Sequence, residues 1–403
     1  MLKIKISIGS VFFIFLSAFV ICNVFLSSTL PYTFPWIQTV LWRVPPLLRV
    51  CFIVLAFFNN TQLTIRKAAF FAVSFLIYCT IGNWAFFDLL FVGILYDNID
   101  YNKFVKCIML SSIIAIVFIL ILYYVNVLPS LLFEREDGTV RESFGFVHPN
   151  ALGRMVMCLC MMYISLVHEH FGIKDFLIML AAVAFVVVYP NSITAAFVIF
   201  FLIIGELLYI TNYRIRKNDA IDSKILKNIS IVLPFFLATV FTFVMIKYNQ
   251  SSVFAESFPL TIKSRIFLGD KAIDRYGIHV LPQHLELTSS IAILTNNSMN
   301  DYFVIDCFYY YLPIQFGIIA TLYLVAEYYI CMFHCISEKN FVRLFICICI
   351  LVYGISENAL LSSSSILFSF AFMRIGKKSR LKHWLKYEAR LLLRKRVLEY
   401  DKK

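Results

Sequence analysis

The stretch that decides the fold is residues 105–128, VKCIMLSSIIAIVFILILYYVNVL, an apolar run with one charged residue, Lys106. A helix needs about 20 such residues to cross a bilayer core of roughly 30 Å. Similar runs recur along the 403-residue chain, which is 61% hydrophobic and 15% charged. No alternation of inward and outward residues dominates. The pattern therefore predicts an all-α polytopic membrane protein and argues against a β-barrel.

Lys and Arg in the short loops predict twelve spans, because inner loops carry cations and short outer loops do not. The first span, which includes the apolar N-terminus, is expected to stay uncleaved. Both termini are expected in the cytoplasm, with two long outer loops at about 129–150 and 248–301 and a transmembrane domain over 1–376. The predicted spans are about 6–27, 36–58, 68–81, 84–96, 105–128, 150–167, 176–189, 192–210, 229–247, 302–333, 342–356 and 364–375.

Two regions of this topology are less regular. The spans at 68–81 and 84–96 are short for a full crossing, and they meet at Gly82-Asn83. The Pro45-Pro46 pair can divide the second span into a re-entrant piece and a true span, because proline interrupts helical hydrogen bonding.

The net charge of +12 is concentrated in residues 377–403, which hold eleven Lys and Arg against three acidic residues. Trp384 and several leucines lie among these cations. The composition predicts a cytoplasmic amphipathic tail on the membrane surface, with anionic lipids as its partner and no nucleic acid.

The eleven cysteines fall inside or close to apolar spans, so disulfides are not expected. Cys331, His334 and Cys335 have a spacing similar to that of metal ligands, but they lie at a span end without a second pair. We predict neither a metal nor a cofactor.

Arginines on the predicted outer side are the main exception to the charge pattern. An Arg in hydrocarbon costs about 2.5–3.5 kcal/mol and usually faces the bundle interior or a wet cavity. Each could also snorkel to lipid headgroups. Together they favour convergence on one anionic ligand, because guanidinium binds phosphate or carboxylate in a bidentate manner. The set comprises Arg43 and Arg49 in the second span, Arg135 and Arg141 in the first outer loop, Arg154 in the helix after it, and Arg265 and Arg275 in the second outer loop.

The first outer loop ends in RESFGFVHPN, residues 141–150. Asn150 is predicted as the N-cap of the next helix, with Arg154 one turn later on the same face. Such a helix terminus attracts anions. In the second loop a helix is expected over about 263–276, followed by an extended piece with His279.

Four pieces of the chain carry a family resemblance: RESFGFVHPNALG (141–153), SRIFLGDKAIDRYG (264–277), IDCFYYYLPIQFGII (305–319) and GISE (354–357). They resemble the Wzy-type O-antigen and capsule repeat-unit polymerases and, more loosely, the O-antigen ligases. The family is known for Arg-x10-Gly-like patterns in its outer loops. Here Arg141 to Gly153 and Arg265 to Gly277 are one residue longer.

The resemblance implies a bundle like that of the GT-C glycosyltransferases, and transfer of a glycan from undecaprenyl pyrophosphate to another lipid-linked repeat unit at the outer face of the bacterial cytoplasmic membrane. Arg141 and Arg265 fall on positions that bind the pyrophosphate-linked substrates. Asp306 and Glu357 match acidic positions of the family, and His148 matches the HPN position. A flippase and a chain-length regulator are candidate partner proteins.

The chemistry predicts arginine rather than metal stabilisation of the diphosphate leaving group. A general base must also take the acceptor's proton, in the order of preference His148, His279 and Glu357. A ligase of the same fold is the first alternative. A flippase or transporter would typically show two related halves, which the sequence lacks, and a membrane scaffold would not account for the outer arginines.

Overall fold

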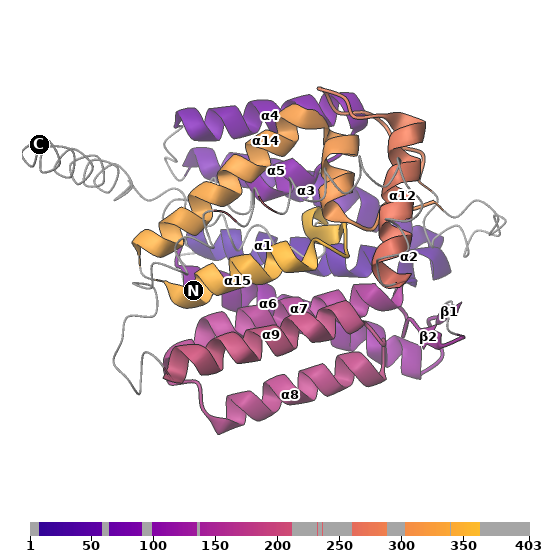
Figure 1. Ribbon diagram of the computed structural model, residues 1–403, viewed down its shortest axis with the longest axis vertical. Helices are drawn as coiled ribbons and strands as arrows, with labels where there is room; N and C mark the ends of the chain where they lie inside the picture. Colours follow the sequence, from indigo (N-terminus) through magenta and orange to yellow (C-terminus); the bar gives the residue numbers. More distant parts are fainter. Residues whose placement is uncertain are drawn as a thin grey trace, which may run out of the picture.

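The computed structural model describes residues 8–58, 64–90, 99–134, 138–211, 260–287, 303–338 and 340–362, together with residues 232 and 236. These residues form a bundle of helices with one short hairpin (Figure 1). The helices are α1 (Ile8–Leu26), α2 (Leu30–Thr33), α3 (Pro35–Phe58), α4 (Ile65–Ile81), α5 (Ala85–Leu89), α6 (Tyr101–Tyr124), α7 (Pro149–Val167), η2 (His168–His170), α8 (Ile173–Val188), α9 (Ile193–Tyr209), α12 (Leu260–Tyr276), α14 (Phe308–Ser337), α15 (Phe341–Tyr353) and η5 (Ala359–Leu361).

Five of the described helices are long and apolar enough to cross a membrane: α1, α3, α6, α7 extended through η2, and α14. Shorter apolar helices, α9 and α15, accompany them. The expectation of a helical, membrane-embedded protein is therefore confirmed. Apart from residues 232 and 236, the predicted span at 229–247 lies outside the described residues, as do the predicted span at 364–375 and the basic tail at 377–403.

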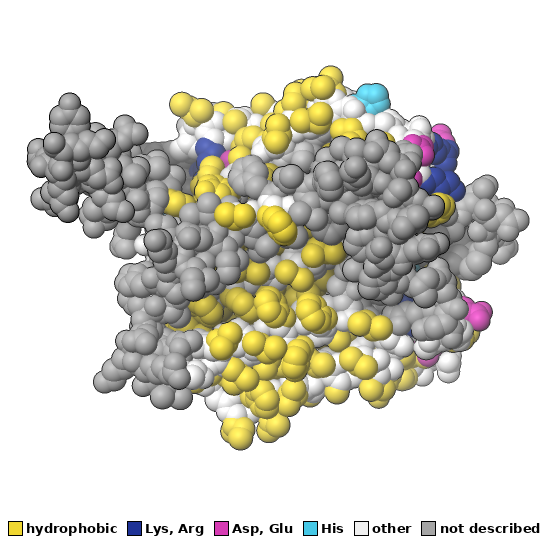
Figure 2. All heavy atoms as spheres, viewed as in Figure 1, with side chains coloured by type: hydrophobic (Ala, Val, Ile, Leu, Met, Phe, Trp, Pro, Cys, Tyr) yellow, Lys and Arg dark blue, Asp and Glu magenta, His cyan; other side chains and the backbone are white. Residues whose placement is uncertain are grey.

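The packing places α1 against α3 and α6, and α7 against α6 and α9, while α8 covers α9. In Figure 1 the α7, α8 and α9 group lies below α1 and α15, and α4 and α14 lie above. Figure 2 shows hydrophobic side chains over the α8 and α9 part of this face. Both helices carry exposed apolar residues, such as Val188 on α8 and Phe197 on α9. Such an outward apolar face suits lipid contact.

The helix α3 runs without interruption through Pro45 and Pro46. The predicted division of this segment at the two prolines is therefore not seen. Their fixed φ near −65° is compatible with helix, although each proline removes one backbone donor.

By contrast, α14 is interrupted at Gly317, where φ is 77° and ψ is 170°. The span predicted at about 302–333 falls largely on this helix, and the interruption was not foreseen from the sequence. Residues 279–283 lie against the interruption, since the N–H of Ile318 donates to the carbonyl of His279 at 3.0 Å. A Cβ at Gly317 would lie 2.6 Å from the carbonyl carbon of Leu281. Only glycine combines this φ with so close a backbone approach.

Candidate functional site

The helix α7 begins at Pro149, so His148 and not Asn150 is its N-cap. The Nδ1 atom of His148 accepts a hydrogen bond from the backbone N–H of Asn150 at 3.1 Å. Proline suits the first helical position because its φ is already helical and it has no N–H to satisfy. The prediction of Asn150 as the cap was therefore wrong by two positions. As a result, the Asn150 side chain is available for other contacts.

Arg141 lies on a hairpin of two antiparallel strands, β1 (Leu132–Glu134) and β2 (Val140–Glu142), directly opposite Phe133. Hydrogen bonds to α6 and to the segment after α1 hold the hairpin and the residues that follow it on the helix bundle. The hydroxyl of Tyr123, on α6, donates to the Glu142 carboxylate at 2.6 Å. The N–H of Thr29 donates to the carbonyl of Gly145 at 2.9 Å. The position of the Arg141 guanidinium is thus set by α6 and by the segment after α1.

Asn150 joins Arg141 to Glu357. Its Oδ1 accepts a hydrogen bond from Nη1 of Arg141 at 3.0 Å. Its Nδ2 donates to Oε1 of Glu357 at 2.6 Å, across 207 residues of sequence. Because an amide offers both a donor and an acceptor, it can connect a cation to a carboxylate without itself carrying charge.

Glu357 and Asp306 meet because the end of α15 is bonded to the start of α14. The N–H of Phe308 donates to the carbonyl of Gly354 at 2.9 Å, and the Asn358 side chain donates to the carbonyl of Ile305. The two acidic residues lie immediately beside these contacts and interact electrostatically. Glu357 is buried.

Arg265 reaches the same place from α12. Its Nε donates to the carbonyl of Ser356 at 3.0 Å. The helix can approach closely because Gly269 faces the ring of Tyr310, where a Cβ would lie 2.2 Å from a ring carbon. Ile266 and Ala272 of α12 are buried with Tyr310 in a small apolar cluster. This packing fixes where Arg265 lies relative to the residues that follow the C-terminal end of α15.

Arg141, Arg154, Arg265, Asp306 and Glu357 form one charged cluster, and these groups act electrostatically on one another. Burial, reinforced by the neighbouring Asp306, raises the pKa of Glu357 to about 7, although Arg154, Arg265 and Arg141 oppose the shift. Burial also raises the pKa of Asp306, against Arg265 and Arg141. Arg154 is buried on α7, one turn beyond Asn150. Three guanidiniums and two carboxyls thus share one site.

His148 is neutral in this setting. Burial, together with Arg141 and Arg154, lowers its pKa to about 3. Since Nδ1 accepts a hydrogen bond, the neutral ring carries its proton on Nε2. The ring of His148 lies 4.6 Å from that of Phe133 on the hairpin, centroid to centroid.

The other predicted residues lie elsewhere or have other partners. Arg49 is buried in a bidentate pair with Asp88, at 2.5 and 2.8 Å. Arg43 is exposed on α3. Arg275 is exposed and lies 3.3 Å from Glu286, and His279 bonds to the carbonyl of Tyr276. Arg135 lies outside the described residues.

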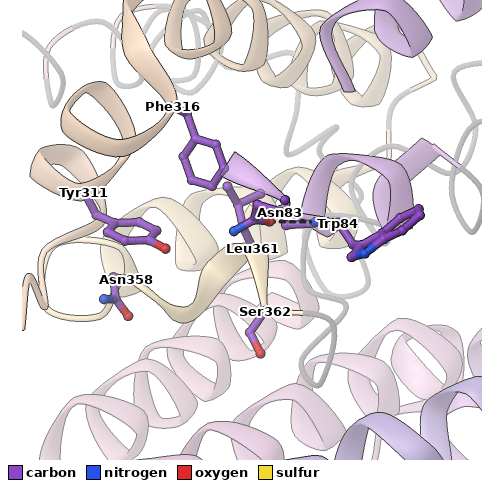
Figure 3. A pocket seen from close by; sticks show the side chains of 9 residues that line it. Asn83, Trp84, Tyr311, Phe316, Asn358, Leu361 and Ser362 are labelled. Carbon is purple, nitrogen blue, oxygen red and sulfur yellow. Dashed lines mark hydrogen bonds between the residues drawn. The ribbon is translucent and has the colours of Figure 1, made fainter. Parts of the chain in front are cut away.

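A pocket of about 440 Å³ adjoins the cluster and was not predicted from the sequence. Figure 3 shows Tyr311 next to Asn358, the residue after Glu357, on the same side of this pocket. Aromatic rings and amides line it, and the aromatic run at 308–316 was the sequence signal for it. Its lining residues are Gly82, Asn83, Trp84, Ala85, Tyr311, Phe316, Asn358, Leu361 and Ser362.

Comparisons with known proteins give the chain no family. No family model matches it, and no curated protein or solved structure does so either.

The raised pKa of Glu357 predicts a specific dependence of stability on pH. Its ordinary value is 4.5 and its folded value is about 7, so the folded state holds this proton more tightly. The free energy of unfolding should therefore fall as pH rises from about 4.5 to 7. Glu357→Gln, which resembles the protonated form, should remove that part of the slope in denaturant unfolding of the purified protein.

The matched control is Glu286→Gln, at an exposed carboxylate. It should leave the slope of stability against pH as in the unmodified protein. An identical slope for Glu357→Gln and the unmodified protein would show that Glu357 does not titrate in this range.

Proposed function

We propose that the protein is a glycan polymerase that joins polyprenyl-pyrophosphate-linked repeat units, with Arg141, Arg154 and Arg265 around the reacting centre. The observation that carries this proposal is the Asn150 bridge. It brings a hairpin arginine and a buried carboxyl together at the end of a membrane bundle. The resemblance of the four sequence pieces supports the substrate class.

The excess of positive charge favours a diphosphate as ligand. Even when Asp306 and Glu357 are both ionised, the three guanidiniums exceed the two carboxylates by one positive charge. Such a site attracts an anion and disfavours a metal cation. Guanidinium groups placed where a diphosphate leaves stabilise the charge that develops in the transition state. The bond that breaks joins the sugar C1 atom to the diphosphate oxygen.

Glu357 is better suited than His148 to serve as general base. A pKa of about 7 lies near the operating pH, where general base catalysis is most effective. His148, with a pKa of about 3 and its Nδ1 already bonded, binds a proton weakly. The ring of His279 is bonded to the carbonyl of Tyr276, and its backbone carbonyl accepts from Ile318, beside the interruption of α14. We therefore propose that Glu357 takes the proton of the acceptor hydroxyl, and that His148 has a positioning role.

The aromatic pocket provides a place for the glycan. Aromatic rings present apolar faces and hydroxyl edges, and the amides of Asn83 and Asn358 offer donors and acceptors for sugar hydroxyls. Asn358 follows Glu357 directly. A sugar in this pocket would thus lie next to the base that activates its hydroxyl.

The number of spans and their orientation are part of the same proposal. Twelve spans in a GT-C-like bundle would place the site at the outer face of the bacterial cytoplasmic membrane, with both termini inside. The positive-inside distribution of Lys and Arg supports this orientation. Undecaprenyl-pyrophosphate-linked glycans would be the substrates, and a flippase would supply them.

Deletion of the gene tests the activity class directly. Lipid-linked single repeat units should accumulate on the outer side of the membrane, because a polymerase consumes them there. A ligase defect would instead leave long lipid-linked chains, and a flippase defect would leave single units on the inner leaflet. Mass spectrometry of extracted lipid-linked glycans gives the chain length, and labelling of intact spheroplasts with a membrane-impermeant reagent gives the leaflet. Either of these outcomes would contradict the proposal.

Complementation with arginine variants tests the site. Arg265→Gln should reduce chain elongation by about 10²–10³-fold, as expected for loss of one donor to a developing anion. Arg275→Gln, ten residues along the same helix and exposed, should elongate normally. Equal effects of the two substitutions would show that Arg265 has no special role.

A chain-elongation assay with purified full-length protein separates the two candidate bases. Glu357→Gln should lower kcat by about 10²–10⁴-fold, whereas His148→Gln should retain most of kcat. The rate of the unmodified enzyme should rise with pH up to about 7 and then level off, as Glu357 loses its proton. If His148→Gln abolishes turnover and Glu357→Gln does not, the assignment is reversed.

A further inference from the structure

Three buried cysteines meet on α14 and α15, away from the cluster around Glu357. The sulfur atoms of Cys331, Cys335 and Cys347 all lie within 4.8 Å of one another, and none of the three forms a disulfide. Cys331 and Cys335 are one helical turn apart and therefore share a face of α14. The hydroxyl of Tyr328 donates to the carbonyl of Cys347 at 2.6 Å, which holds α15 against that face.

The third member of this group was not predicted. The sequence suggested Cys331, His334 and Cys335 as a set with metal-like spacing. In the structure, Nε2 of His334 instead lies 3.2 Å from the carboxylate of Glu338. Cys347 takes its place from the neighbouring helix, twelve residues beyond Cys335. The resulting set is three thiols from two helices.

A buried cation lies beside the thiols. Arg343 is 4% exposed, and within the described part of the chain its Nε and Nη2 atoms have no hydrogen-bond partner. It lies one turn before Cys347 and interacts electrostatically with all three cysteines. Its guanidinium also lies over the ring of Tyr101, at 4.3 Å from the centroid. A buried cation is costly unless a negative charge compensates it.

We propose that Cys331, Cys335 and Cys347 bind a soft divalent cation of the zinc class as thiolates, with Arg343 balancing the charge. Three thiolates, one divalent cation and one guanidinium sum to zero, whereas a monovalent metal would leave a net negative charge in the bundle. On binding, three S–H bonds release three protons to solvent and three metal–sulfur bonds form. No electron is transferred.

The geometry requires only small side-chain movements. Around a tetrahedral zinc with bonds of about 2.3 Å, sulfurs lie roughly 3.8 Å apart. Thiols already within 4.8 Å can reach this arrangement by rotation about χ1. A bound cation would join the C-terminal half of α14 to α15. It would act independently of the proposed polymerase chemistry, because the two sites share no residue.

The test uses purified full-length protein, treated with chelator and titrated with Cd²⁺ as a spectroscopic probe for zinc. About one Cd²⁺ per chain should bind, with the ultraviolet charge-transfer band of cadmium thiolate. Cys331→Ser and Cys347→Ser should each lose the band. Cys349→Ser, buried on α15 but outside the cluster, should keep it. Arg343→Leu should weaken Zn²⁺ affinity about 10–100-fold, as is usual on loss of a group outside the ligand shell.

Alkylation of the unmodified protein provides a second measurement that needs no cysteine variant to fold. With Cd²⁺ present, mass mapping in mild denaturant should show protection of Cys331, Cys335 and Cys347, and no added protection of Cys158 and Cys160. The absence of a saturable band, an unchanged band in folded Cys347→Ser, or equal alkylation of all five cysteines with and without Cd²⁺ would overturn the proposal.

Discussion

The site depends on one neutral side chain, Asn150, which contacts a cation on one side and a carboxyl on the other. Its Oδ1 accepts from Arg141 at 3.0 Å and its Nδ2 donates to Glu357 at 2.6 Å. This arrangement is possible because the helix cap falls on His148 and leaves the amide free. If the helix began two residues later, the same amide would be occupied by backbone N–H groups.

Two packing arrangements support this bridge. The start of α14 is bonded to the end of α15 through Phe308 and Gly354, which places Asp306 beside Glu357. Gly269 lets α12 pack closely on Tyr310, which brings Arg265 to the carbonyl of Ser356. The hairpin then adds Arg141 from the other side. Burial and the neighbouring Asp306 raise the pKa of Glu357 to about 7 against the opposing effect of the three guanidiniums, and this property links the fold to the proposed chemistry.

Part of this site could be predicted from the sequence, because arginines in the predicted outer loops depart from the charge pattern of the short loops, and because the family resemblance marked Asp306 and Glu357. Arg141, Arg154, Arg265, Asp306 and Glu357 do lie together. Arg49 was also predicted as a ligand-binding residue, but it pairs with Asp88, 39 residues away, and sequence spacing does not reveal a pairing of that length. The set with metal-like spacing contained His334 in the sequence analysis but contains Cys347 in the structure. The cause is the same, because helix packing decides which side chains meet.

Local backbone effects account for other differences. Pro149 moved the cap to His148, and Gly317 divided α14, because each residue imposes its own φ on the chain. The hydrophobic pattern correctly predicted a mostly helical chain with apolar helices of membrane length, because apolar runs of this length have few other stable forms in a bilayer. It carries no information on interruptions that a single glycine introduces within an apolar segment.

The central claim is that arginines from two distant segments hold one diphosphate at Glu357. The most direct test is calorimetric binding of farnesyl diphosphate to the purified full-length protein and to Arg141→Gln, Arg265→Gln and the double variant. Each single substitution should weaken binding by about 10–100-fold, as for loss of a hydrogen bond to a charged group. The double variant should show a coupling of about 0.5–3 kcal/mol between the two. Unchanged affinity in both single variants would contradict the account. Additive losses in the double variant, together with an equal loss of affinity in Arg275→Gln, would also contradict it.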